Sequence, residues 1–201
     1  MIRVLLADDQ ALVRGAVAAL LELESDLEVV GQVGSGQEAI EACASTRPDV
    51  ALLDVEMPGM DGIAATEAVK LAHPHVRVLI VTTFGRPGYL RRALRAGADG
   101  FVVKDTPAPQ LAEAVRRVHA GLRVVDPTLA ADSVVTGESP LTTRETDVLR
   151  IATRGVVVGD IARQLSLSEG TVRNHLSSAI GKTGARTRSE AARIATDNGW
   201  L

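Results

Sequence analysis

Short apolar runs alternate with amphipathic stretches over the first 120 residues of the chain. Five of these runs are nearly continuous in Val, Leu and Ile: Ile2–Ala7, Leu27–Val33, Val50–Leu53, Val76–Val81 and Gly100–Val103. Such runs are typical of strands that are buried on both faces of a parallel sheet. Because helical patterns separate them, the sequence predicts a doubly wound α/β domain.

The pattern changes after residue 120. Residues 121–139 have weak periodicity and contain Gly121, Pro127 and Gly137, which predicts a linker. From residue 140 only helical patterns follow, two of them opened by capping-box spacings at Thr142–Glu145 and Thr187–Glu190. We therefore predict an α/β domain over 1–120, a linker over 121–139 and an all-α, four-helix domain over 140–201.

Composition excludes several classes of protein. Cys43 is the only cysteine, so an internal disulfide and a cysteine-based zinc site are excluded. No apolar run reaches the roughly 18–20 residues that span a bilayer, and the N-terminus does not have the pattern of a signal peptide. We expect a cytoplasmic protein with no direct membrane insertion.

Polar side chains follow the predicted strands. Asp8 and Asp9 follow the first strand and Asp54 the third, while Thr82 and Lys104 follow the fourth and fifth. One such acid is commonly only a helix N-cap. The full set is expected to converge, because the carboxyl ends of parallel strands meet at one edge of a sheet. Three carboxylates repel one another unless a hard cation such as Mg²⁺ is present, and a nearby lysine and hydroxyl suit phosphoryl transfer.

The same segment resembles the receiver domain of two-component response regulators. The resemblance is carried by Leu6-Ala7-Asp8-Asp9, Leu53-Asp54-Val55-Glu56-Met57-Pro58-Gly59-Met60-Asp61-Gly62, Thr82-Thr83 and Gly100-Phe101-Val102-Val103-Lys104. It implies a flavodoxin-like fold in which Asp54 accepts phosphate from a sensor histidine kinase. It also implies that Mg²⁺ is held by Asp8, Asp9, Asp54 and the backbone carbonyl of Glu56.

Three further roles follow from this resemblance. Lys104 contacts the phosphoryl group, and Thr82 and Phe101 form a switch pair in which the hydroxyl moves to the phosphate and the ring follows. Phe101 is also compatible with a plain core aromatic, and Asp61 is interpreted as a helix or turn acid.

An enzyme acting on a separate substrate is an alternative. A phosphatase with an aspartate nucleophile needs a second acid two residues later, and Glu56 stands in that place after Asp54. The position of the motif and the length of the domain do not fit that class, and no Gly-rich nucleotide loop is present. We therefore expect a protein that is not an enzyme.

The last domain has the pattern of a helix-turn-helix. Val172, Leu176 and Ile180 repeat at helical spacing, and Gly170, Asn174, Ser177 and Ser178 fall on the opposite side with Arg173 at its edge. A small, hydrogen-bonding face can enter the major groove, where Asn reads adenine and Arg reads guanine or holds phosphate. A plain solvated helix face is the alternative.

This domain resembles the LuxR-type DNA-binding domain. The matching segments are Leu141–Leu149, Asp160–Leu165, Ser168–Leu176 and Arg188–Ala191, and both domains together resemble the NarL/FixJ family. The resemblance implies that Arg173, Asn174 and Ser177 face the bases. It implies phosphate or scaffold positions at Thr171, His175, Lys182 and Arg188.

Some residues depart from the family pattern. Val158-Gly159 replaces the usual Asn and Lys-like residue, and Gly181 and Gly184 weaken the end of the recognition helix. We therefore expect weak DNA binding by one monomer and dependence on a homodimer that forms on phosphorylation. The segments Thr82–Leu90 and Asn198–Trp200 are closest to the DesR subgroup, which pairs with membrane histidine kinases and controls lipid desaturation.

The net charge of −3 for the whole chain argues mildly against DNA binding, but this charge is unevenly distributed between the two predicted domains. Residues 1–139 hold 13 basic and 19 acidic side chains, whereas residues 140–201 hold 9 basic and 6 acidic ones. The C-terminal domain is therefore the basic one, with a charge of +3. The sequence predicts a phosphorylation-switched regulator that binds promoter DNA. The alternative is a phosphorylation-dependent protein-interaction module without DNA function.

Overall fold

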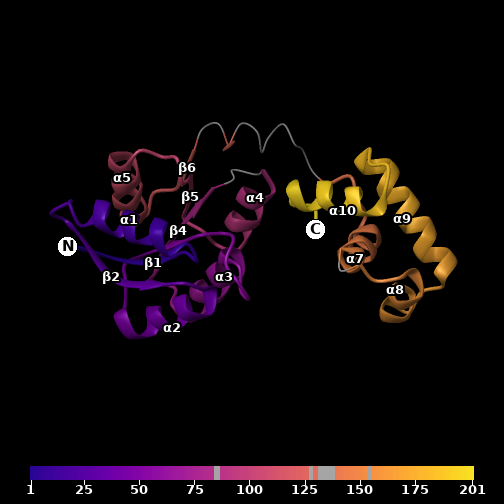
Figure 1. The fold of residues 1–201 in the computed structure, drawn as a ribbon, viewed down its shortest axis with the longest axis horizontal. Coiled ribbons are helices and arrows are strands. Elements are labelled where there is room, and N and C mark those ends of the chain that lie inside the picture. Colours follow the sequence, from indigo (N-terminus) through magenta and orange to yellow (C-terminus); the bar gives the residue numbers. More distant parts are fainter. Residues whose placement is uncertain (84–86, 127–128, 131–138, 154) are drawn as a thin grey trace. The chain divides into compact units, whose positions relative to one another are not determined.

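The computed structural model describes residues 1–83, 87–126, 129–130, 139–153 and 155–201 of the chain (Figure 1). Contacts between residues divide the chain into two compact units. The first consists mainly of the residues up to Ala131, and the second mainly of Asp132–Leu201. Each unit is described by itself.

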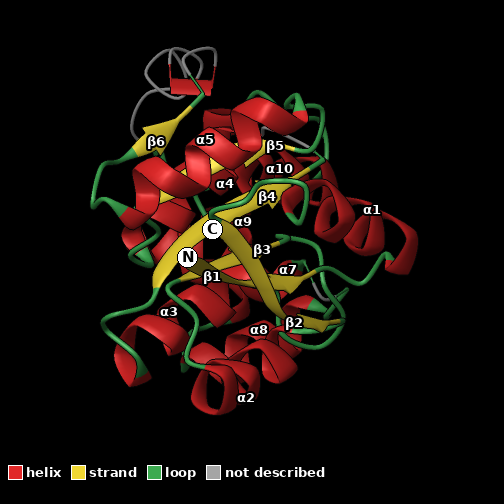
Figure 2. Ribbon diagram, turned by 90° about the vertical axis from the view of Figure 1, so that its left-hand side faces the viewer, coloured by secondary structure: helices red, strands yellow, loops and turns green. Residues whose placement is uncertain are grey.

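The first unit contains a six-stranded parallel sheet with the strand order β2-β1-β3-β4-β5-β6 (Figure 2). The strands are β1 (Ile2–Ala7), β2 (Leu27–Val33), β3 (Val50–Leu53), β4 (Arg77–Thr82), β5 (Gly100–Val103) and β6 (Val124–Val125). The five expected strands are confirmed, with bounds that differ by no more than one residue. The doubly wound fold class is confirmed as well.

The sixth strand was not expected from the sequence. β6 lies within the segment interpreted as a linker, and its Val124 and Val125 pair with Gly100 and Phe101 of β5. Two residues show no periodicity, whereas the edge of β5 offers unpaired backbone groups that a passing segment can bond. Residues 127–128 and 131–138 of the predicted linker lie outside the described residues.

Helices cover both faces of the sheet. α1 (Ala11–Leu21) and α5 (Ala108–His119) share one apolar cluster, and α2 (Gly36–Thr46), α3 (Gly62–Ala72) and α4 (Pro87–Arg95) share the other. Alternate residues of β1 belong to different clusters, since Val4 and Leu6 pack with α1 and α5 while Leu5 and Ala7 pack on the opposite side. This burial on both faces explains the continuous apolar runs.

The second unit consists of α7 (Thr143–Ala152), α8 (Val158–Leu165), α9 (Glu169–Thr183) and α10 (Arg188–Asp197) around an apolar cluster of its own. The capping box at Thr142 and Glu145 is present, and Thr187 caps α10 by accepting from the backbone N–H of Glu190 at 3.1 Å. These four helices confirm the predicted all-α unit.

A tight turn joins α8 to α9. Ser166 ends α8 in the left-handed region with φ of 55°, and the Ser168 hydroxyl accepts from the backbone N–H of Thr171 at 3.1 Å to begin α9. α9 continues through Gly181 and ends at Gly184, whose φ is 67°. Among the described residues, no helix is long and apolar enough to cross a membrane.

Candidate functional site

Three carboxylates come together at the carboxyl edge of the sheet. Asp8 and Asp9 follow β1 and Asp54 follows β3, and one carboxylate oxygen from each lies within 4.8 Å of the other two. β1 and β3 are neighbouring strands, which places the ends of both at the same edge. The structure therefore brings these acids together.

Lys104 binds two of these acids. Its Nζ lies 2.7 Å from Asp8 Oδ2 and 2.9 Å from Asp54 Oδ2, and its backbone N–H donates to the Thr82 carbonyl at 2.8 Å. Burial alone would lower the pKa of Lys104, but its hydrogen bonds to Asp54 and Asp8 raise the pKa above its usual value. The ammonium group therefore stays charged beside the carboxylates.

Asp54 is the most buried of the three acids, with 3% of its surface exposed. Burial raises the pKa of Asp54 and the charge of Asp8 acts in the same direction, while the hydrogen bond from Lys104 opposes them. Asp54 Oδ1 is buried without a hydrogen-bond partner among the described residues. An unpartnered oxygen beside two other carboxylates suits a hard divalent cation.

The backbone around Asp54 is held by the start of α3. The Gly62 N–H donates to the Val55 carbonyl at 3.0 Å, and a Cβ on Gly62 would lie 1.9 Å from the Asp54 carbonyl oxygen. The Asp61 carboxylate accepts from the Ala64 N–H at 2.7 Å, so Asp61 is the helix acid that was expected. The role of Gly62 was missed, although it ends the motif around Asp54.

The remaining predicted residues of the first unit surround this pocket. Thr82 is 1% exposed at the end of β4, and Phe101 is fully buried in the same apolar cluster as α4. Glu56 is exposed, and its carboxylate accepts from the Tyr89 hydroxyl at 3.3 Å. Sequence reasoning also missed Arg14, whose guanidinium donates to the Asp8 carbonyl.

The second unit presents a polar face on α9. Arg173, Asn174 and Ser177 are exposed, whereas the opposite side of the helix, which includes Val172 and Leu176, is buried. The Arg173 guanidinium lies 2.5 Å from Glu169, and both side chains are more than half exposed. Such a surface pair is weak, so Arg173 can exchange Glu169 for another anion.

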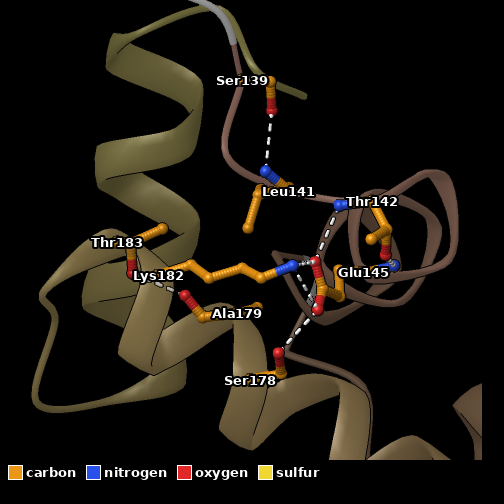
Figure 3. A network of polar contacts seen from close by, with 8 residues as sticks. All are labelled: Ser139, Leu141, Thr142, Glu145, Ser178, Ala179, Lys182 and Thr183. Carbon is orange, nitrogen blue, oxygen red and sulfur yellow. Dashed lines mark hydrogen bonds and ion pairs between the residues drawn. The ribbon is translucent and has the colours of Figure 1, made fainter.

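The other predicted positions of this unit have partners within the protein. The Thr171 and Ser168 hydroxyls lie 2.8 Å apart, and the Arg188 guanidinium donates to the Val156 carbonyl at 3.2 Å. His175 is half-buried. Lys182 binds the buried carboxylate of Glu145, with Nζ–O distances of 2.9 and 2.7 Å (Figure 3).

Comparison with known proteins assigns both units to families. The profile described as "Response regulator receiver domain" matches residues 4–116, and the profile described as "Bacterial regulatory proteins, luxR family" matches residues 139–195. This chain is a luxR-family response regulator. The sheet with its acidic edge is therefore the receiver domain, and the four helices are the DNA-binding domain.

Whole-length relatives agree with this assignment. Two Bacillus subtilis proteins are similar over all 201 residues and over the whole of their own lengths: the uncharacterized transcriptional regulatory protein YvfU at 43% identity and the transcriptional regulatory protein DesR at 40%. The crystal structure of the response regulator ChrA of a heme-sensing two-component system matches with a TM-score of 0.61 at 32% identity, covering 100% of this chain and 98% of that one. The luxR-family regulator is a DNA-binding transcription factor. The phosphatase and the module without DNA function are not favoured.

Proposed function

We propose that phosphorylation of Asp54 by a sensor histidine kinase switches this luxR-family regulator into a homodimer that binds promoter DNA. The observation that carries the proposal is the unpartnered oxygen of a buried Asp54, which stands beside two further acids and a charged lysine. The regulator works in the cytoplasm. It is not an enzyme with an external substrate, because the phosphoryl group is transferred to its own Asp54 carboxylate.

The carboxylate of Asp54 acts as the nucleophile. Its oxygen forms the new bond to phosphorus while the N–P bond of the donor phosphohistidine breaks, which leaves an acyl phosphate on Asp54. Lys104 keeps a positive charge at the place where phosphoryl oxygens arrive. The carboxylates of Asp8, Asp9 and Asp54 and the Glu56 carbonyl would hold Mg²⁺, which when bound would supply positive charge to the phosphoryl oxygens.

The switch pair connects this pocket to the rest of the receiver domain. Thr82 is the last residue of β4, and Phe101 lies on the neighbouring strand β5, where it pairs with Ile80 of β4. A hydroxyl drawn toward the phosphate vacates space in a buried layer, and the Phe101 ring follows because close-packed interiors do not tolerate voids.

The acceptor is tested by phosphorylation with acetyl phosphate and Mg²⁺. We expect the native chain to gain one phosphoryl group by intact-protein mass spectrometry, and Asp54→Asn to gain none. Asp105→Asn removes an exposed acid close to the pocket and is the matched control, which should be phosphorylated like the native chain. Equal uptake by Asp54→Asn would place the acceptor elsewhere.

The recognition face is assigned to Arg173, Asn174 and Ser177, with Thr171, His175, Lys182 and Arg188 as phosphate or scaffold positions. Arg173→Ala is expected to weaken specific DNA binding by about 1–3 kcal/mol and to relax the preference at one base pair. Arg163→Ala is the control, since Arg163 is an 82% exposed arginine on α8 whose ion pair with Asp160 lies within the same helix. Fluorescence anisotropy with matched and mismatched duplexes measures both effects. If both variants lost the same affinity for DNA, Arg173 would not be the residue that contacts a base.

The resemblance to DesR extends the proposal to membrane-lipid desaturation. The identity of 43% to YvfU exceeds the 40% to DesR, so overall similarity alone does not favour that target. Measuring fatty-acid unsaturation after deletion of the gene tests this extension independently of DNA binding.

A further inference from the structure

A buried carboxylate joins the first turn of α7 to the last turns of α9. The Glu145 side chain is 5% exposed and contacts the recognition helix through Ser178 and Lys182. Its two oxygens accept from the Thr142 backbone N–H at 2.7 Å and from the Ser178 hydroxyl at 2.6 Å, in addition to both contacts from Lys182 (Figure 3). The carboxylate is therefore hydrogen-bonded both to the start of α7 and to the last turns of α9.

These donors keep Glu145 ionised. Burial alone would raise the pKa of Glu145, but the hydrogen bonds from Lys182, Ser178 and Thr142 lower it to about 2. A charge that is desolvated and multiply hydrogen-bonded is sensitive to the loss of one partner.

Lys182 has two conceivable roles, as a DNA phosphate contact or as part of the scaffold. To reach a phosphate its ammonium group would leave Glu145, and the carboxylate would stay buried without a counter-charge. Lys182 itself is 35% exposed, but the Glu145 carboxylate is only 5% exposed, so the loss of its charged partner is unfavourable. The exposed pair of Arg173 and Glu169 has no such penalty. Arg173 can therefore leave Glu169 for a DNA phosphate or base more readily than Lys182 can leave Glu145.

We propose that Glu145 is the positioning residue of the recognition helix and that Lys182 acts on Glu145, not on a DNA phosphate. Ser178 and Lys182 lie one turn apart on α9 and are both held to α7, so the orientation of the exposed face of α9 depends on this contact. The inference rests on the proposed use of Arg173, Asn174 and Ser177 in DNA recognition, and it decides between the roles left open for Lys182.

The first test is the salt dependence of DNA binding by the full-length chain. The probe is a duplex carrying the sequence that the native chain enriches from a random library. A lost phosphate contact lowers the slope of log K against log salt by about 0.9, whereas a lost scaffold contact leaves the slope unchanged. We expect Lys182→Met to weaken binding by about tenfold, equivalent to about 1.4 kcal/mol, with the native slope.

Two further variants control for charge. Arg150→Met removes one positive charge from α7, where Arg150 is 54% exposed and lies 3.6 Å from Asp147, and it should leave the affinity nearly native. Lys182→Arg keeps a charged donor that can reach Glu145 and should restore most of the affinity. A slope reduced by about one for Lys182→Met overturns the inference.

The second test is a double-mutant cycle of Glu145→Gln and Lys182→Met. If Lys182 acts through Glu145, the double variant binds DNA no more than about threefold weaker than the weaker single variant. Independent roles predict that the two losses multiply. Should Glu145→Gln fail to fold, the salt slope of Lys182→Met compared with that of Lys182→Arg still decides the question, because only a lost phosphate contact lowers the slope. A native chain that enriches no sequence overturns the proposed DNA contacts, whereas an altered slope overturns only the assignment of Lys182.

Discussion

At the scale of single residues, Gly62 shows how one missing side chain shapes the proposed phosphoacceptor pocket around Asp54. Its Cα faces the backbone of Asp54 so closely that a Cβ would lie 1.9 Å from the carbonyl oxygen and 2.8 Å from the carbonyl carbon. A backbone atom cannot move aside as the end of a side chain can. The position of the Asp54 carboxylate therefore depends on a glycine eight residues later.

Gly62→Ala is expected to displace the end of β3 and to destabilise the receiver domain by about 1–3 kcal/mol, as overpacking does. Phosphorylation by acetyl phosphate should slow in parallel. The control is Gly15→Ala, because a Cβ at Gly15 in the exposed middle of α1 meets nothing within 4 Å. That change should stabilise the domain by about 0.5–1 kcal/mol. Urea unfolding followed by circular dichroism measures both, and equal stability of the two variants would contradict the clash.

At the scale of elements, the pairing of α7 with α9 depends on a residue that first looks like a simple helix cap. The capping-box spacing of Thr142 and Glu145 was read from the sequence and is confirmed. The second role of Glu145 was not visible, because Ser178 and Lys182 lie 33 and 37 residues further along the chain. Local spacing predicts local hydrogen bonds, but only the packing of two helices determines which distant donors reach a carboxylate.

The lowered pKa of Glu145 predicts acid sensitivity of the DNA-binding domain. The ordinary value of 4.5 falls to about 2 in the folded state, so the unfolded chain takes up the proton first as pH falls. The resulting stability is fully present above about pH 4.5 and is lost as the pH approaches 2. Trp200, the only tryptophan, packs against the core of this domain and reports its unfolding by fluorescence.

We expect the urea midpoint of the native chain to fall between pH 5 and pH 3 more than that of Glu145→Gln, which has no proton to gain at this position. Glu190→Gln is the control and should follow the native chain, since Glu190 lies in the first turn of α10 at a more exposed position, where its carboxylate accepts from the Arg186 backbone N–H at 2.8 Å. A native midpoint that changes no more than that of Glu145→Gln would contradict the pKa shift.

At the scale of the whole molecule, charge is divided between the two domains. Residues 1–139 carry a net charge of −6 and residues 140–201 one of +3. The acidic part contains the cluster of Asp8, Asp9 and Asp54, and the basic part contains α9, the proposed recognition helix. An excess of three positive charges supports only modest non-specific attraction to DNA, so a single copy is expected to bind weakly.

Dimerisation is therefore expected to supply much of the affinity. The native chain treated with acetyl phosphate and Mg²⁺ should shift from monomer to dimer in sedimentation velocity, and Asp54→Asn should stay monomeric. A duplex with two half-sites about 10–10.5 bp apart should bind the dimer far more tightly than a duplex with one. Equal affinity for both duplexes would show that one recognition helix suffices.

The sequence by itself determined the succession of strands and helices along the chain, the acids at the strand ends and the polar side of α9. Each of these depends on a continuous apolar run, on a period of 3.6 residues or on a short motif, and neighbouring residues define all three. The tertiary structure decided the two-residue β6, the close approach of Gly62 to Asp54 and the binding of Lys182 by Glu145. The physical reason is the same in all three cases. Each depends on the distance between backbones or side chains from different elements, and that distance exists only once the elements have packed.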